Sequence, residues 1–224
     1  MPKRPKRILI TGFDAFDKHR SNPSELLVGT LSETLTEKGK DSVIIETLVL
    51  PTCCNKAWSK LRRRLNSANG DYSTIIMTGL AHTRTKLSLE RFALNIRDYR
   101  VKDNGGHQFD DVKIERRGPD ALRTIAPLAV LKAALNRKGF PCDISNHAGT
   151  FICNEIYYRA LFHQLQVGSD APVLFVHIPL PRTYLRTLRA GAQGRRRAPS
   201  LNGYSAVEHM ARGIEAAALL CLRG

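Results

Sequence analysis

The chain has 224 residues, 42% of them hydrophobic, so it is long enough to bury a substantial core and too apolar for a disordered protein. No apolar run reaches the ~18 residues that a membrane-spanning helix needs, which disfavours an integral membrane protein. The formal net charge of +15 disfavours cationic partners and favours anionic ones, nucleic acid included.

The basic residues are not spread evenly. They gather at residues 3–7, 62–64 and 182–199. No aromatic–basic recognition sequence of the kind found in RNA-binding domains accompanies them, so we interpret them as solvated charge and keep a nucleic-acid surface as the alternative. The N-terminal stretch MPKRPKRILITG contains no apolar signal segment, and we expect a cytoplasmic protein with one domain over residues 1–224.

Strands and helices are predicted to alternate. In chain order we predict a strand at 8–11, a helix at 22–35, a strand at 43–50, a helix at 57–65, a strand at 74–78, extended chain at 87–101, a turn at Asn104-Gly105, a helix at 125–138, a helix after Cys153, a strand at 173–178 and a helix that starts with a capping box at Ser205. The second element has the clearest start signal, because Asn22 is a good N-cap and Pro23 suits the first helical position. This alternation predicts an α/β fold with helices on both faces of a sheet.

Three residues that can carry chemistry fall near the predicted carboxyl ends of strands or in the loops beyond them, where open α/β sheets bind ligands: Glu90, Cys153 and His177. Cys153 follows a small-residue turn and opens a helix, whose unpaired N–H groups and dipole stabilise a thiolate. We therefore predict a lowered pKa for the Cys153 thiol. An imidazole can accept the thiol proton, a carboxylate can orient the imidazole, and the Cys153 N–H can form part of an oxyanion hole.

Each of the three also has a structural alternative. A buried cysteine usually packs in a core, and a histidine at the end of a strand can serve as a hydrogen-bonded structural residue. Glu90 stands next to Arg91, with which it can form a surface ion pair of little energetic value. The five cysteines form no CxxC pair and the histidines no HExxH motif, so we expect free thiols, no metal and no cofactor.

Several separated blocks of the sequence resemble the pyroglutamyl peptidase type I family, also called pyrrolidone-carboxylate peptidases, cysteine peptidase family C15. The blocks occur in the family's order and at its approximate spacing. They are TGFDAF (11–16), NPSELL (22–27), LSLERFALNI (87–96), AGTFICN (148–154) and VHIPLP (176–181). The resemblance implies a three-layer α/β/α sandwich of the phosphorylase/hydrolase type with a mixed, mostly parallel sheet.

The resemblance also implies roles for individual residues. Cys153 matches the nucleophile, His177 the base and then acid, and Glu90 the carboxylate that orients the histidine. The other implied site residues are Arg100 near the oxyanion, Phe13 and Phe16 around the pyroglutamyl ring, Leu80 beside the lactam, and Phe151 and Ile152 in the apolar wall. A homo-oligomer, a dimer or tetramer, is implied as well, with N-blocked pyroglutamyl peptides as substrates.

The sequence departs from the family's pattern in one loop. Relatives carry a GQAGGR-like stretch where this chain has GLAHTR, so Leu80 replaces a glutamine and His82 and Thr83 replace glycines. His147 stands where a small polar residue is common, and the basic segment 182–199 is longer than usual. Two alternatives to pyroglutamyl hydrolysis therefore stay open: hydrolysis of another N-blocked amide, and a catalytically inactive protein that binds anionic partners through its basic charge.

Overall fold

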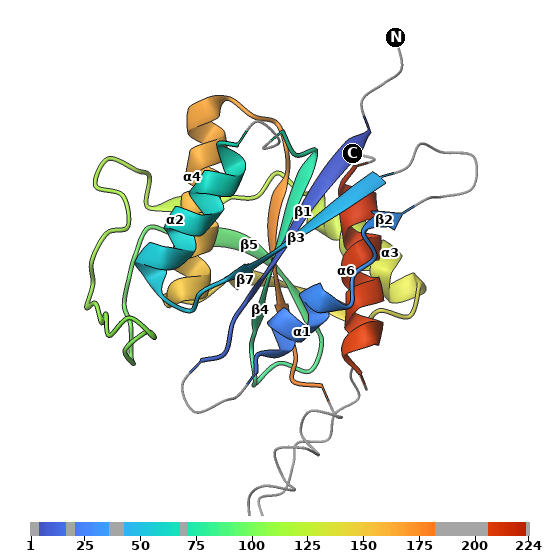
Figure 1. The fold of residues 1–224 in the computed structure, drawn as a ribbon, viewed down its shortest axis with the longest axis horizontal. Helices are drawn as coiled ribbons and strands as arrows, with labels where there is room; N and C mark the ends of the chain where they lie inside the picture. The colour runs from blue at the N-terminus through green and yellow to red at the C-terminus, as the bar shows by residue number, and fades with distance from the viewer. Residues whose placement is uncertain (1–4, 17–20, 36–42, 68–70, 182–205, 223–224) are drawn as a thin grey trace, which may run out of the picture.

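A computed structural model describes residues 5–16, 21–35, 43–67, 71–181 and 206–222 (Figure 1). In chain order its elements are β1 (Lys6–Phe13), α1 (Pro23–Gly29), β2 (Thr34–Leu35), β3 (Val43–Leu50), α2 (Cys54–Leu65), β4 (Thr74–Leu80), β5 (Leu87–Leu94), β6 (Ala121–Arg123), α3 (Leu128–Arg137), β7 (Cys142–His147), α4 (Ile152–Val167), β8 (Val173–Ile178) and α6 (Val207–Cys221). The basic segment 182–199 and Ser205 of the predicted capping box lie outside the described residues.

The strands of the described residues form one eight-stranded mixed sheet. Its order is β2-β3-β1-β4-β8-β5-β6, and β7 pairs with β5 beside this path. The central pairs β3·β1, β1·β4 and β4·β8 are parallel, as is β5·β7, whereas β5 runs antiparallel to β8 and β6, and β2 runs antiparallel to β3. The predicted α/β class with a mixed, mostly parallel sheet is confirmed.

Helices cover both faces of this sheet (Figure 1). Helices α1, α3 and α6 pack on one face, and α2 and α4 pack on the other. The core under α1, α3 and α6 is called the first core, and the core under α2 and α4 the second. Along β1 the side chains of Ile8 and Ile10 enter the first core, and that of Leu9 enters the second core. A strand that buries both faces needs an uninterrupted apolar run, which explains the sequence of β1. Among the described residues, no helix combines the length and apolarity needed to cross a membrane.

The bounds of β3 and β8 agree with the prediction, but the helix predicted at 22–35 is wrong beyond Gly29. Its start is confirmed, since the Asn22 side chain accepts the N–H of Ser24 at 3.0 Å. Leu35 belongs instead to the short strand β2, where it still packs against the first core. The helical spacing of Leu27, Leu31 and Leu35 therefore predicted correctly that these side chains pack against the core, but predicted the wrong secondary structure for Leu35.

Candidate functional site

The carboxyl ends of β4 and β8 bring the first parts of the site together. His177 of β8 lies opposite Gly79 of β4 on one side and opposite Ser88 of β5 on the other. Glu90 follows Ser88 by two residues in β5, so both side chains project from the same face of the sheet. That face carries α2 and α4, because Phe175, two residues before His177, belongs to their core.

His177 and Glu90 are in direct contact. Nδ1 of His177 lies 2.7 Å from Oε1 of Glu90, whose side chain has no exposed surface. A carboxylate at this distance accepts a hydrogen bond from the Nδ1–H group, which leaves Nε2 of the neutral ring as the proton acceptor. The pair therefore holds the imidazole in the tautomer that a general base requires.

Cys153 approaches the same place from α4. It is the second residue of that helix, whose first N–H groups have no partners within the helix. A Cβ built on Gly79 would lie 3.0 Å from Sγ of Cys153 and 2.9 Å from Cζ of Phe175. The thiol thus sits directly over Gly79, next to the strand position of His177, and the absence of a side chain at residue 79 makes room for it.

The predicted lowering of the Cys153 pKa is wrong for this site. Desolvation is the main cause that raises the pKa of the thiol to about 12, and the charge of Glu90 adds to it; only the residue's own backbone N–H acts in the opposite direction. The helix N-terminus does not outweigh burial beside a carboxylate. The free thiol is therefore protonated at neutral pH, and its activation needs a base such as His177.

Aromatic side chains cluster at the start of α4, beside Cys153 in the sequence. The ring centroid of Phe151, the N-cap of α4, lies 5.4 Å from that of Phe16 and 4.6 Å from that of Tyr99. Phe13 and Ile152 are each 2% exposed and belong to the core beneath this cluster. Such walls suit a flat apolar group with few charges.

The family model for pyroglutamyl peptidase matches residues 6–219 of this sequence. The chain belongs to the pyroglutamyl peptidase family. Pyrrolidone-carboxylate peptidase of Fusobacterium nucleatum is 36% identical over 176 residues, which cover 78% of each chain. The enzyme of the same name from Bacillus subtilis is 36% identical over 174 residues, again 78% of each chain. Among solved structures, pyrrolidone carboxyl peptidase from Thermococcus litoralis superposes with a TM-score of 0.84 at 28% identity, over 97% of this chain and 94% of that one.

Membership in this family identifies the chain as a peptidase and supports the three-layer fold.

The loop that departs from the family's pattern follows β4. Leu80 is half-buried at the end of β4, and His82 and Thr83 are exposed. The N–H of Arg84 donates to the carbonyl of Ala81 at 2.9 Å, which closes a tight turn through these residues. The larger side chains of His82 and Thr83 therefore point into solvent rather than crowd the thiol.

His147, the other departure, stabilises the turn before the helix. Its Nδ1 accepts the N–H of Gly149 at 3.2 Å, and Gly149 has a positive φ of 83°. Thr150 is then fixed to the neighbouring loop, because its hydroxyl donates to the carbonyl of Asp98 at 2.9 Å and its carbonyl accepts the N–H of Asp98 at 3.1 Å. These contacts fix the entry into α4 and hence the position of Cys153.

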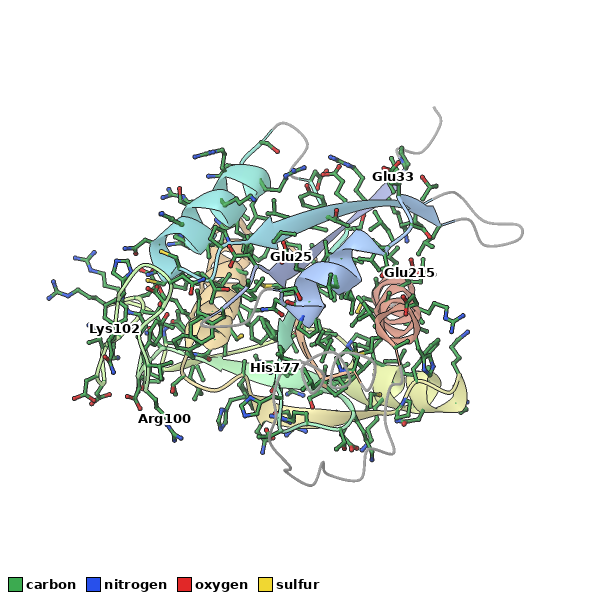
Figure 2. The ribbon with its side chains drawn as sticks, turned by 60° about the horizontal axis from the view of Figure 1, so that its bottom comes forward. Glu25, Glu33, Arg100, Lys102, His177 and Glu215 are labelled. Carbon is green, nitrogen blue, oxygen red and sulfur yellow. The ribbon has the colours of Figure 1, made fainter. Side chains whose placement is uncertain are left out.

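Arg100 lies in that neighbouring loop. It is exposed, and Figure 2 shows it at the outer margin of the molecule, apart from His177. Its implied role near the oxyanion stays a prediction. The hydrogen-bond donors adjacent to Cys153 in the sequence are the backbone N–H groups at the start of α4.

Sequence reasoning missed residues that support the site without touching the thiol. Asn154 is buried and holds the end of β5: its Oδ1 accepts the N–H of Leu94 at 2.8 Å, and its Nδ2 donates to the carbonyls of Leu94 (2.9 Å) and Ile96 (3.1 Å). The only sequence signal for it was a polar residue directly after the cysteine. Arg84, whose guanidinium lies near Glu90, had no signal beyond its place in the divergent loop.

A second group of potential ligand atoms, from Cys53, Asp103 and His107, lies within 4.8 Å of one another. The Asp103 carboxylate already accepts the N–H groups of Cys54, Gly105 and His107, together with Nδ1 of His107. These bonds outweigh burial and lower the pKa of Asp103. Because its acceptors are occupied, the group ties the loop to the start of α2 rather than presenting open ligands.

Proposed function

We propose that this protein is a cysteine exopeptidase that hydrolyses the amide bond after an N-terminal pyroglutamyl residue. The observation that carries the proposal is the 2.7 Å contact between His177 and Glu90 beside the position where the Cys153 thiol lies over Gly79. Membership of the pyroglutamyl peptidase family supports the substrate class.

In the first half of the reaction, Nε2 of His177 takes the thiol proton as Sγ of Cys153 attacks the pyroglutamyl carbonyl carbon. The oxyanion is stabilised by backbone N–H groups at the start of α4, which have no acceptor within the helix. His177 then gives the proton to the leaving amine, the C–N bond breaks, and a thioester remains on Cys153.

In the second half, water attacks the thioester with His177 again as the base. The C–S bond breaks, the thiolate recovers the proton, and free pyroglutamate leaves. Glu90 stays ionised throughout and stabilises the imidazolium that forms twice per cycle. The proton that leaves with the amine is thus replaced by one from the attacking water, which returns the thiol to its starting state.

We assign the recognition of the blocked N-terminus to the apolar wall. The rings of Phe16 and Phe151 lie 5.4 Å apart at an interplanar angle of 55°. Leu80 ends β4, and Ile152 precedes Cys153 at the start of α4. A neutral lactam fits such a slot, whereas an α-ammonium group would lose its hydration without gaining a partner, at a cost of several kcal/mol. The proposed substrates are therefore N-blocked peptides.

Leu80 favours a second candidate within the same reaction, the hydrolysis of another N-blocked amide. A leucine offers no side-chain hydrogen bond to the lactam where relatives carry glutamine. A panel of pyroglutamyl, N-acetyl and N-formyl amides separates the two candidates. If Leu80→Gln raises kcat/KM only for the pyroglutamyl amide, the wild-type preference lies elsewhere.

The deciding experiment uses purified, reduced protein and a pyroglutamyl fluorogenic amide. Cys153→Ala should abolish release with the fold unchanged by circular dichroism. Cys142→Ala is the matched control, because Cys142 is also a free thiol with a raised pKa but packs in the core on the opposite face. Retained activity in the Cys153 variant would refute the assignment.

Two further expectations accompany this proposal. We predict that the protein is cytoplasmic and that it forms a homo-oligomer, a dimer or tetramer, whose mass can be measured by light scattering. If the protein instead serves anionic partners without hydrolysis, it should retain nucleic acid at physiological ionic strength and lose it as salt increases.

A further inference from the structure

The Glu90 carboxylate has an unusual environment for an ionised group. It has no exposed surface, Oε1 contacts His177, and Oε2 has no hydrogen-bond partner among the described residues. Burying a carboxylate is costly unless a positive charge or several hydrogen bonds compensate. A neutral histidine supplies one hydrogen bond and no charge, so another group must keep Glu90 ionised in the resting site.

Arg84 is the residue with that charge. Its Nη2 lies 3.7 Å from Oε1 of Glu90, the one Lys or Arg contact with Glu90 among the residues the structure describes. The side chain is held in place from two strands: Nη1 donates to the hydroxyl of Ser88 at 3.1 Å, and Nη2 donates to that of Ser145 at 3.0 Å.

Each of the two serines is the cross-strand partner of one member of the His177–Glu90 pair. Ser88 lies opposite His177 in the pairing of β5 with β8, and Ser145 lies opposite Glu90 in the pairing of β5 with β7. The guanidinium is thus anchored by hydroxyls and contributes its charge from 3.7 Å, beyond hydrogen-bond distance. The Oε1 atom remains free to accept a hydrogen bond from the Nδ1–H group of His177.

We propose that Arg84 is a positioning residue that keeps Glu90 ionised and so fixes the tautomer and orientation of His177. The proposal rests on the proposed function for its consequence in catalysis, but not for its effect on the thiol. The contacts of the Arg84 guanidinium are with Ser88, Ser145 and Glu90, not with the thiol or the imidazole. It acts through the carboxylate.

The consequence is a dependence on pH. Two other titratable groups face the pair within the part of the chain that the structure describes, and both are neutral: the Cys153 thiol, and Tyr157, whose hydroxyl donates to the carbonyl of Glu90 at 3.1 Å. Without the guanidinium, protonation of both Glu90 and His177 becomes easier, because a nearby positive charge no longer opposes it. The base would then be lost at a higher pH than in the wild type.

The test compares Arg84→Met with Arg84→Lys and with Arg91→Met as the matched control. Arg91 adjoins Glu90 in sequence, but its guanidinium donates to Asn146 at 3.0 Å and makes no contact with the carboxylate. In Arg84→Met we expect kcat at pH 6 to fall about tenfold or more, with KM within about twofold and partial recovery by pH 9. Arg84→Lys should restore most of kcat, and Arg91→Met should match the wild type.

A second readout needs no substrate: the rate of alkylation of Cys153 by iodoacetamide as a function of pH. The lower limb of this profile should move to higher pH in Arg84→Met alone. If pyroglutamyl amides are not cleaved but this shift occurs, the role of Arg84 stands and the proposed function fails. A folded Arg84→Met variant with a wild-type alkylation profile overturns the role, even if its melting temperature falls. Should Arg84→Met not fold, Ser145→Ala replaces it, with a smaller shift expected and an unchanged profile equally decisive.

Discussion

Replacement of Gly79 by alanine measures how closely the thiol is packed against the sheet. The new methyl carbon would lie 3.0 Å from Sγ of Cys153 and 2.9 Å from Cζ of Phe175. Ordinary contacts between carbon atoms are about 3.5–4.0 Å, so both neighbours, or the strand that carries residue 79, must move by about 0.5–1 Å. The Phe175 ring is fully buried, and the sulfur moves only with the start of α4 or by a change of rotamer. A shift of about 1 Å at the reacting atom costs about 10²-fold in rate.

We therefore expect Gly79→Ala to lower kcat/KM on the pyroglutamyl amide by about 10²-fold. Overpacking should also cost about 1–3 kcal/mol of stability, equivalent to a melting temperature lower by ~2–4 °C for each kcal/mol in a chain of this size. Gly29→Ala is the control, because no atom lies within 4 Å of its added Cβ and the residue ends α1. A folded Gly79→Ala variant with wild-type kcat/KM would refute the reasoning, since the sulfur could not then occupy the position described.

Two further predictions concern stability. Asn154→Ala removes the hydrogen-bond partners of the Leu94 N–H and of the Leu94 and Ile96 carbonyls. The free energy of unfolding, measured in urea, should therefore fall by about 2–4 kcal/mol. A loss below about 0.5 kcal/mol would contradict this expectation. Burial raises the pKa of Cys221 from its ordinary value of 9.0 to about 12, so between these pH values the folded state keeps a proton that the unfolded state releases, and stability falls as pH rises. Cys221→Ala should reduce that slope by up to about 1.4 kcal/mol per pH unit, and equal slopes in variant and wild type above pH 9 would exclude the buried thiol as the cause.

The sequence predicted secondary structure best where a single physical requirement decided it. The runs at 43–50 and 173–178 are apolar because β3 and β8 contribute to buried cores, and their bounds were predicted to the residue. The helix start at Asn22 was equally clear, because it depends on one local hydrogen bond. The end of that helix was not, since Leu35 is buried in a strand whose pairing with β3 is a contact between distant segments.

By itself, the sequence determined which side chains are available for chemistry, their order along the chain and their family, since these depend only on residue identity and spacing. Only the tertiary structure decided how they act on one another. Register across the sheet sets His177 beside Gly79, and the docking of α4 brings the Cys153 thiol over that glycine. The same packing desolvates the thiol near Glu90 and raises its pKa, where the local sequence alone had predicted the opposite. Electrostatic effects depend on distance and burial, and both are set by the packing of segments far apart in the chain.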